Sequence, residues 1–146
     1  MKKFFVAGLV AIVFVSVWFY ARHPLGMKAI INGHPVRLEL ALTPPEKERG
    51  LGYRDSLAMD SGMLFVYQNK DRYGFWMKGM RFPLDFIWID GNRVVELSEH
   101  IGAPATDTSR AVELSPKTPV DKVLEVNAGV IEKLGVRVGD IIQFID

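Results

Sequence analysis

The stretch "RYGFWMKGMRFPLDFIWIDG", Arg72 to Gly91, decides the fold. Its second half, LDFIWID (84–90), is apolar at nearly every position, so it predicts a β-strand that is largely buried on both faces. The turn Asp90-Gly91-Asn92 follows and returns the chain into RVVELSE (93–99). The stretch therefore predicts a hairpin of buried strands, preceded by another short strand, YGFWM (73–77).

Further strands appear on either side of this hairpin. Asn32-Gly33 lies between two apolar runs and is typical of a tight hairpin, because both turn positions need positive φ. Residues 36–42 then alternate apolar and polar side chains, which predicts a strand with one buried face. The remaining strands are predicted at residues 62–67, in the segment that begins at Asp121 and runs through Val126, and in the closing segment GDIIQFID.

Two short helices are expected among the strands. Residues 43–46 form a Thr-x-x-Glu capping box with proline at the first helical position, and Gly50 or Gly52 ends that helix. Asn127 is predicted to cap a second helix, which Gly135 ends. Seven or eight short strands with two short helices predict a mainly β fold, a compact barrel- or sandwich-like domain.

The N-terminus has the composition of a membrane anchor. A basic start precedes an unbroken apolar run at residues 4–20, and such a helix spans about 26 Å, near the lower limit for crossing a bilayer. A cleaved signal peptide ends in small residues, whereas this run ends in Trp-Phe-Tyr, which suits the lipid–water boundary. We expect one transmembrane helix, an uncleaved anchor or signal, over residues 1–21, a tether over 22–26 and a single domain over 27–146.

The charges predict the orientation of this anchor. Lys2 and Lys3 should keep the N-terminus in the cytoplasm. We therefore expect a single-pass protein of a bacterial or archaeal cytoplasmic membrane, held in the lipid by residues 4–20. Its domain would lie in the periplasm or outside the cell.

The composition narrows the possible functions. The 146 residues carry a net charge of +1, with 49% hydrophobic and 24% charged residues, as in globular proteins. A near-neutral body offers no broad cationic field, so nucleic acid is not an expected partner. The chain has no cysteine, which removes disulfides, cysteine-ligated zinc and thiol catalysis. No zinc or calcium motif occurs, so no metal or other cofactor is expected.

Four motifs are similar to those of a known family. "ERGLGYR", "GMLFVY", "FWMKGMRFPLDFIWID" and "VLEVNAG" resemble, in this order, the bacterial and archaeal family called domain of unknown function 192. The resemblance implies a compact β-rich domain with no established reaction. The family pattern has Met where Gly52 stands and Asn-Thr at residues 79–80. On this resemblance the candidate site residues are Arg54, Trp76, Lys78, Asp85, Glu125, Asn127 and Gly129.

These polar residues suggest a binding cleft. If they converge, they form a mixed-charge cleft beside Trp76 that would orient an anionic or carbohydrate ligand, because arginine pairs with carboxylate or phosphate and tryptophan stacks on sugar faces. The alternative is that Lys78 simply pairs with Asp85 and Asn127 only caps a helix.

Two further functions remain open from the sequence. Asp85 and Glu125 would form the acid–base pair of a small envelope hydrolase if their carboxyl groups lay about 5 to 9 Å apart. The four methionines at 59, 63, 77 and 80 would suit Cu(I), although Met63 and Met77 fall in apolar strand patterns and are expected to pack in the core. We expect a non-enzymatic binding or accessory module for an envelope component or a protein partner.

Overall fold

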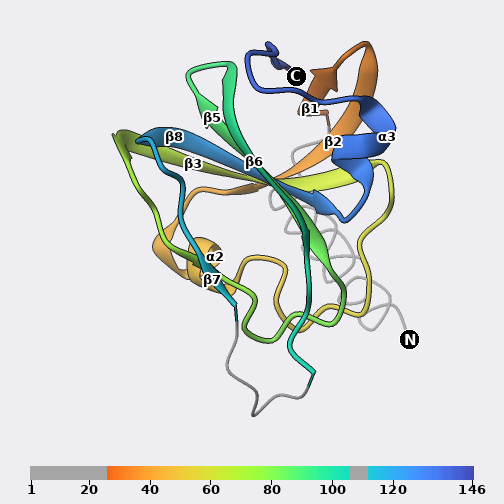
Figure 1. Cartoon of the computed structure of the whole chain (residues 1–146), viewed down its shortest axis with the longest axis vertical. Helices are drawn as coiled ribbons and strands as arrows, with labels where there is room; N and C mark the ends of the chain where they lie inside the picture. The colour runs from red at the N-terminus through yellow and green to blue at the C-terminus, as the bar shows by residue number, and fades with distance from the viewer. Residues whose placement is uncertain (1–25, 106–111) are drawn as a thin grey trace, which may run out of the picture.

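The fold is known from a computed structural model that describes residues 26–105 and 112–146 (Figure 1). The predicted anchor at 1–21 and nearly all of the tether lie outside the described residues. Within the described part, no helix combines the length and apolar content needed to cross a membrane. The described elements are β1 (Lys28–Ile31), β2 (His34–Ala41), α2 (Pro44–Arg49), β3 (Ser61–Asp71), β4 (Phe75–Trp76), β5 (Leu84–Asp90), β6 (Arg93–Ile101), β7 (Glu113–Leu114), β8 (Val120–Asn127), α3 (Val130–Leu134) and β9 (Gln143–Ile145).

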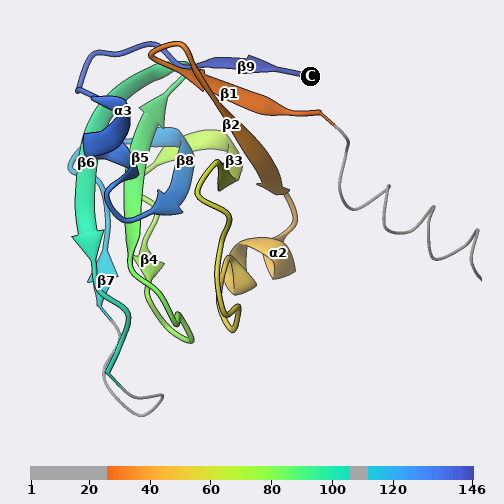
Figure 2. The ribbon, with the colours of Figure 1, turned by 90° about the vertical axis from the view of Figure 1, so that its right-hand side faces the viewer.

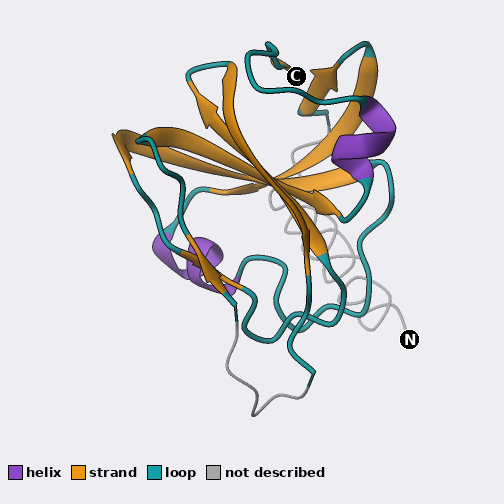
Figure 3. Cartoon of the chain, in the orientation of Figure 1, coloured by secondary structure: helices purple, strands orange, loops and turns teal. Residues whose placement is uncertain are grey.

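One large sheet dominates the domain, which confirms the mainly β prediction (Figure 3). Its seven strands follow the order β6-β5-β8-β3-β2-β1-β9, and β4 pairs with β7 in a separate two-stranded sheet. Neighbouring strands are antiparallel except β2 and β3, which run parallel. The segment that contains α2 connects these two parallel strands, a crossover that the sequence patterns did not reveal.

The large sheet curls into a half-barrel (Figure 2). At one end the segment before β9 reaches β6: the Val94 amide donates to the Asp140 carbonyl at 2.9 Å, and the Ile142 amide donates to the Asn92 carbonyl at 2.9 Å. The first and last strands of the sheet are thereby joined at this end. At the other end α2 and the loops between α2 and β5 occupy the opening (Figure 1).

The predicted central hairpin is confirmed and lies deep in the sheet. Strand β5 is buried along almost its whole length, as its apolar sequence requires, and it pairs with β6 on one side and β8 on the other. The strand predicted at residues 73–77 is shorter: only Phe75–Trp76 pairs, with β7.

The two faces of the curled sheet carry two apolar clusters. One includes Ile87, Ile89 and Leu124 and packs beneath α3. The other, on the face toward α2, includes Phe65, Phe86 and Trp88. Successive side chains along each strand point to opposite faces of the sheet. This alternation decides on which face each candidate site residue of the sheet lies.

The first helix has the predicted ends. The Thr43 amide donates to Glu46 Oε2 at 2.9 Å in the capping box, and Gly50 closes the helix with φ of +50°. The second helix differs from the prediction, because its N-cap is Gly129, not Asn127. Asn127 is instead the last residue of β8, and its side chain turns toward a neighbouring loop.

Candidate functional site

Glu125 is the residue around which the sheet face toward α2 is organised. Strand pairing places Glu39, Met63, Glu125 and Phe86 in one row across β2, β3, β8 and β5. Directly paired residues point to the same face of a sheet. The Glu125 carboxyl therefore projects among apolar side chains on the face that packs toward α2.

The Glu125 carboxyl is buried and lacks a full set of partners. The residue is only 5% exposed, and its Oε2 atom has no hydrogen-bond partner among the described residues. Burial raises the pKa of this carboxyl to about 8, and the charge of Arg54 opposes that rise only in part. At neutral pH the group is therefore mostly protonated, because a charge in this apolar setting would be poorly solvated.

A pocket of about 200 Å³ opens onto this carboxyl. Gly50, at the end of α2, lies beside it: a Cβ atom at this position would stand 3.8 Å from Glu125 Oε2 and 3.2 Å from the Phe65 ring. The positive φ at Gly50 also disfavours any other residue. Glycine thus leaves open the space above the carboxyl. Besides Gly50, Phe65 and Glu125, the pocket is lined mainly by Lys47, Glu48, Arg49, Tyr67, Trp76 and Lys78.

The walls of the pocket combine positive charge with aromatic surface. Three cationic residues line it, Lys47 and Arg49 from α2 and Lys78 from the segment after β4, against the exposed carboxylate of Glu48. Trp76 on β4 is 49% exposed and lines the same pocket. This set of groups suits a small ligand with negative charge and a ring to stack.

Tyr67 continues the alternating row of β3 that faces the pocket. The Lys47 ammonium lies 4.1 Å above the Tyr67 ring, a cation–π contact that holds the lysine at the wall. The Tyr73 ring stacks on the Tyr67 ring, with the two ring centroids 3.5 Å apart. Burial, with smaller contributions from Tyr73 and Glu125, raises the pKa of Tyr67 to about 12, so the phenol stays neutral.

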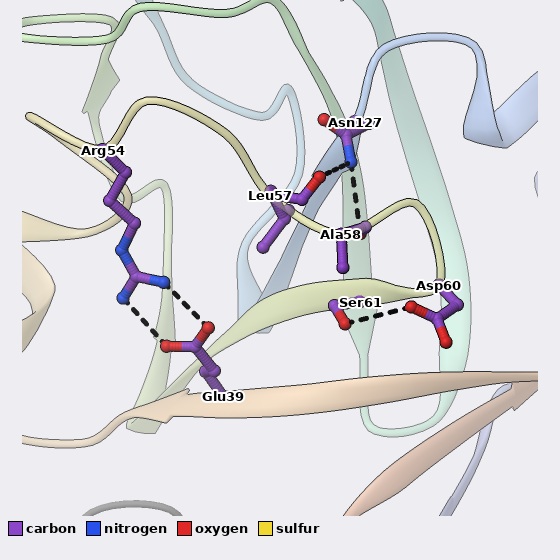
Figure 4. Close-up of polar contacts among 7 residues, drawn as sticks. All are labelled: Glu39, Arg54, Leu57, Ala58, Asp60, Ser61 and Asn127. Atoms are coloured by element: carbon purple, nitrogen blue, oxygen red, sulfur yellow. Dashed lines mark hydrogen bonds and ion pairs between the residues drawn. The ribbon is translucent and has the colours of Figure 1, made fainter.

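Arg54 lowers the pKa of the buried Glu125 carboxyl by its charge, but it pairs with the carboxylate of Glu39 (Figure 4). Its two terminal nitrogens donate to the two oxygens of Glu39 at 2.8 Å each, and these hydrogen bonds are the main cause that raises the Arg54 pKa. Such a bidentate pair fixes the guanidinium plane. Arg54 therefore contributes positive potential near Glu125, while its guanidinium donates hydrogen bonds to Glu39.

Asn127 holds a loop in place beside the site. Its side-chain amide donates to the carbonyls of Leu57 at 2.9 Å and Ala58 at 3.3 Å, as Figure 4 shows. This loop joins Arg54 to β3, so Asn127 is a positioning residue for the segment that carries the arginine.

Asp85 does not belong to this pocket. In the pairing of β5 with β8, Asp85 lies opposite Val126 and Phe86 lies opposite Glu125, so the two carboxyl side chains point to opposite faces of the sheet. Asp85 is fully buried and accepts hydrogen bonds from the amides of His100 at 2.8 Å and Ile131 at 3.0 Å. Asp85 therefore ties α3 to the sheet. It does not take part in the predicted common cleft, and its hydrogen bonds go to backbone amides and not to Lys78.

The structure thus divides the seven predicted site residues. Trp76, Lys78 and Glu125 line one pocket, and Arg54 and Asn127 support the same face. Asp85 and Gly129, the left-handed N-cap of α3, belong to the opposite face. The sequence analysis missed the roles of Lys47, Gly50 and Tyr67 in the pocket. The alternation of Met63, Phe65 and Tyr67 along one strand was the signal available for the tyrosine.

The methionines pack as the core interpretation predicted. Met63, Met77 and Met80 are buried in the apolar cluster on the face toward α2, whereas Met59 is 56% exposed. Across the described residues, no group of three or more His, Asp or Glu side chains is gathered in a way that would hold a metal ion.

The fold and the site define a class of protein: a half-barrel domain with a small pocket between α2 and the sheet, beside a buried acid. Residues 27–144 match the family model DUF192, described as Uncharacterized ACR. The chain belongs to this family, as its motifs indicated.

Two solved structures share the fold. A protein of Sinorhizobium meliloti 1021, named as a candidate transcription regulator, is 32% identical, with a TM-score of 0.71 over 81% of this chain and 91% of that one. A protein of unknown function from Novosphingobium aromaticivorans DSM 12444 is 31% identical, with a TM-score of 0.68 over 80% of this chain and 82% of that one. No curated protein matches the sequence.

Proposed function

We propose that the chain is a membrane-anchored, extracytoplasmic binding module that holds a small envelope molecule in the pocket beside α2. The observation that carries this proposal is the Glu125 carboxyl, buried, without a partner for Oε2, and lining an open pocket. A buried polar atom without a partner costs free energy, and a ligand that supplies the partner recovers it. The volume of about 200 Å³ favours a ligand smaller than a drug-sized molecule.

A binding role is better supported than hydrolysis. The hydrolase alternative requires Asp85 and Glu125 to flank one bond, and these side chains point to opposite faces of the sheet. Asp85 also uses both carboxylate oxygens to bind backbone amides. The regulatory name of the S. meliloti protein is not part of this proposal, because a net charge of +1 does not favour nucleic acid as the ligand.

The proposal is tested by plugging the pocket. Gly74 lines it, and a Cβ atom there meets nothing within 4 Å, so Gly74→Phe adds bulk at the pocket without strain in the core. Gly102→Phe is the matched control, since Gly102 is equally open but is not among the residues that line the pocket. The full chain in detergent is screened by thermal unfolding against glucose, glucosamine, glucuronate and benzoate.

A ligand at ten times its Kd should stabilise the wild type by about 1.4 kcal/mol, or roughly 5 °C in Tm. The Gly102→Phe variant should show the same shift and the Gly74→Phe variant none. If every probe leaves the wild type unchanged, or if the plugged variant responds like the control, the pocket is not the binding site.

The anchor is tested separately by fractionation of cells. We expect the full-length chain, with residues 1–21 intact by mass spectrometry, in the membrane fraction. Recovery of a soluble form that begins near residue 22 would show that the apolar run is a cleaved signal peptide.

A further inference from the structure

We propose that the pocket is a site for small carboxylic acids, bound as anions, whose carboxylate accepts a hydrogen bond from the protonated side chain of Glu125. This inference rests on the proposed function and names the chemical class of its ligand. It begins with the partners of Glu125. Across the sheet the acid faces Met63 and Phe86, which offer no polar atom to it. The nearby cation, Arg54, is engaged by Glu39.

A carboxyl group in this environment is a hydrogen-bond donor. Burial raises the pKa of Glu125 to about 8, so the group carries its proton at neutral pH. The protonated form offers one O–H donor, and the Glu125 side chain lines the pocket while its buried Oε2 atom has no hydrogen-bond partner among the described residues. The best acceptor for such a donor is an ionised oxygen, because charge-assisted hydrogen bonds are about twice as strong as neutral ones.

The walls select for the charge of the ligand. Lys47, Arg49 and Lys78 line the pocket against one exposed carboxylate, Glu48. A ligand carboxylate that enters therefore meets positive charge at the walls and a proton donor at the acid. A cationic ligand would meet an excess of positive charge and a carboxyl group that must first ionise. An uncharged ligand would gain only the hydrogen bond.

The half-exposed indole of Trp76, which lines the pocket, favours a ligand with a ring beside the carboxylate. Sugar rings and aromatic rings both stack on an indole face. A uronic acid and an aromatic carboxylic acid share the required chemistry, an anionic carboxylate on a flat ring. The experiment distinguishes these two sources.

Binding involves no net transfer of a proton at neutral pH. The ligand enters as the anion and Glu125 keeps its proton, which lies in the hydrogen bond between the two carboxyl groups. When Glu125 ionises, two negative groups would meet and binding is lost. The charged or titratable groups that face Glu125 from the surrounding elements are Glu39, Lys47, Glu48, Arg49, Arg54, Tyr67 and Lys78.

The test measures Kd by calorimetry on the full chain in detergent, with glucuronate against glucose and benzoate against benzyl alcohol. We expect the acid of one pair to bind at least about tenfold more tightly than its neutral partner. The pair that shows this difference identifies the ring as sugar or aromatic. The same Kd should be about tenfold weaker at pH 9 than at pH 7, because the ligand stays ionised over this range while Glu125 loses its proton.

Two variants assign the pH dependence to Glu125. Glu125→Gln keeps an N–H donor that does not ionise, so it should bind the acid at pH 7 and lose the weakening at pH 9. Glu125→Ala should bind at least about tenfold more weakly at pH 7. Burial lowers the pKa of Lys47, so loss of its charge at high pH is another possible cause of weaker binding. Lys47→Arg is the control for this cause, because the arginine stays charged at pH 9 and the weakening caused by Glu125 should remain.

The possible failures are distinct. If glucose or glucosamine binds as tightly as the acids and Gly74→Phe blocks it, the pocket is a binding site but the acid class is wrong. If the acids bind with the same Kd at both pH values, or if Glu125→Gln keeps the full weakening at pH 9, the donor role of Glu125 is wrong. If no probe binds, both this inference and the proposed function fail.

Discussion

Replacement of Glu125 by glutamine is the perturbation that most directly tests how this domain tolerates a buried acid. The glutamine side chain has nearly the same size and does not ionise, so the two proteins differ mainly in one titration. In the native state burial holds the Glu125 pKa at about 8, against 4.5 for an unperturbed carboxyl. Between these values the unfolded chain releases a proton that the folded protein keeps.

The sign and size of the effect follow from that difference. Because the unfolded state binds fewer protons in this window, the free energy of unfolding of the wild type falls as the pH rises from 4.5 toward 8. Each pKa unit corresponds to about 1.4 kcal/mol. Relative to the variant, the wild type should therefore lose roughly 1 kcal/mol by pH 5 and roughly 3 kcal/mol by pH 7. This stabilising contribution of the proton is fully present below pH 4.5 and lost as the pH passes 8.

The assay is urea unfolding of the full chain in detergent, followed by near-UV circular dichroism at several pH values. Any fixed cost of the amide shifts the two curves by a constant amount, so the pH-dependent difference isolates the titration. The slope m should be the same in both proteins. Glu48→Gln is the matched control, because Glu48 lines the same pocket but is exposed. Parallel stability profiles for wild type and Glu125→Gln from pH 5 to 8 would refute the reasoning.

Three further substitutions test other parts of the structure. Trp88→Ala removes a fully buried indole from the cluster on the face toward α2 and should cost about 3–5 kcal/mol, read from the urea midpoint; a midpoint that barely moves would contradict its core position. Asp85→Ala leaves two amides without an acceptor and should cost about 2–4 kcal/mol by urea unfolding, while the Kd of any pocket ligand stays within about twofold. Arg54→Ala removes a positive charge that lowers the Glu125 pKa, so that pKa, followed by infrared spectroscopy of the protonated carboxyl, should rise; a fall would contradict the assigned sign.

Local sequence signals predicted the individual elements well. The Asn32-Gly33 turn joins β1 to β2, and Asn32 takes a positive φ of 48° there, as its turn position requires. The capping box of α2 and the burial of β5 on both faces also follow from a few neighbouring residues. Such features depend on short-range steric and hydrogen-bonding rules, which the sequence displays directly.

The arrangement of the site depended on register, which the sequence does not display. The β5–β8 pairing sends Glu125 and Asp85 to different clusters, and a shift of one residue in that pairing would have brought them to the same face. The assignment of Asn127 failed for a similar reason, because a side chain suited to cap a helix also suits a loop carbonyl brought near by distant pairing. Trp76 and Lys78 both line the pocket because they are two residues apart in one segment, a proximity that the sequence displays directly.

The relation between Arg54 and Glu125 explains how the acid stays neutral beside a positive charge. An arginine that turned its fork onto Glu125 would hold that carboxyl ionised and close the pocket with an internal ion pair. Glu39, in the same row of the sheet, instead engages both guanidinium nitrogens at a partly exposed position. The positive potential then lowers the Glu125 pKa only in part, and the acid keeps both its proton and its unpaired oxygen. The domain thus bears the cost of a buried polar atom on a side chain that lines a pocket.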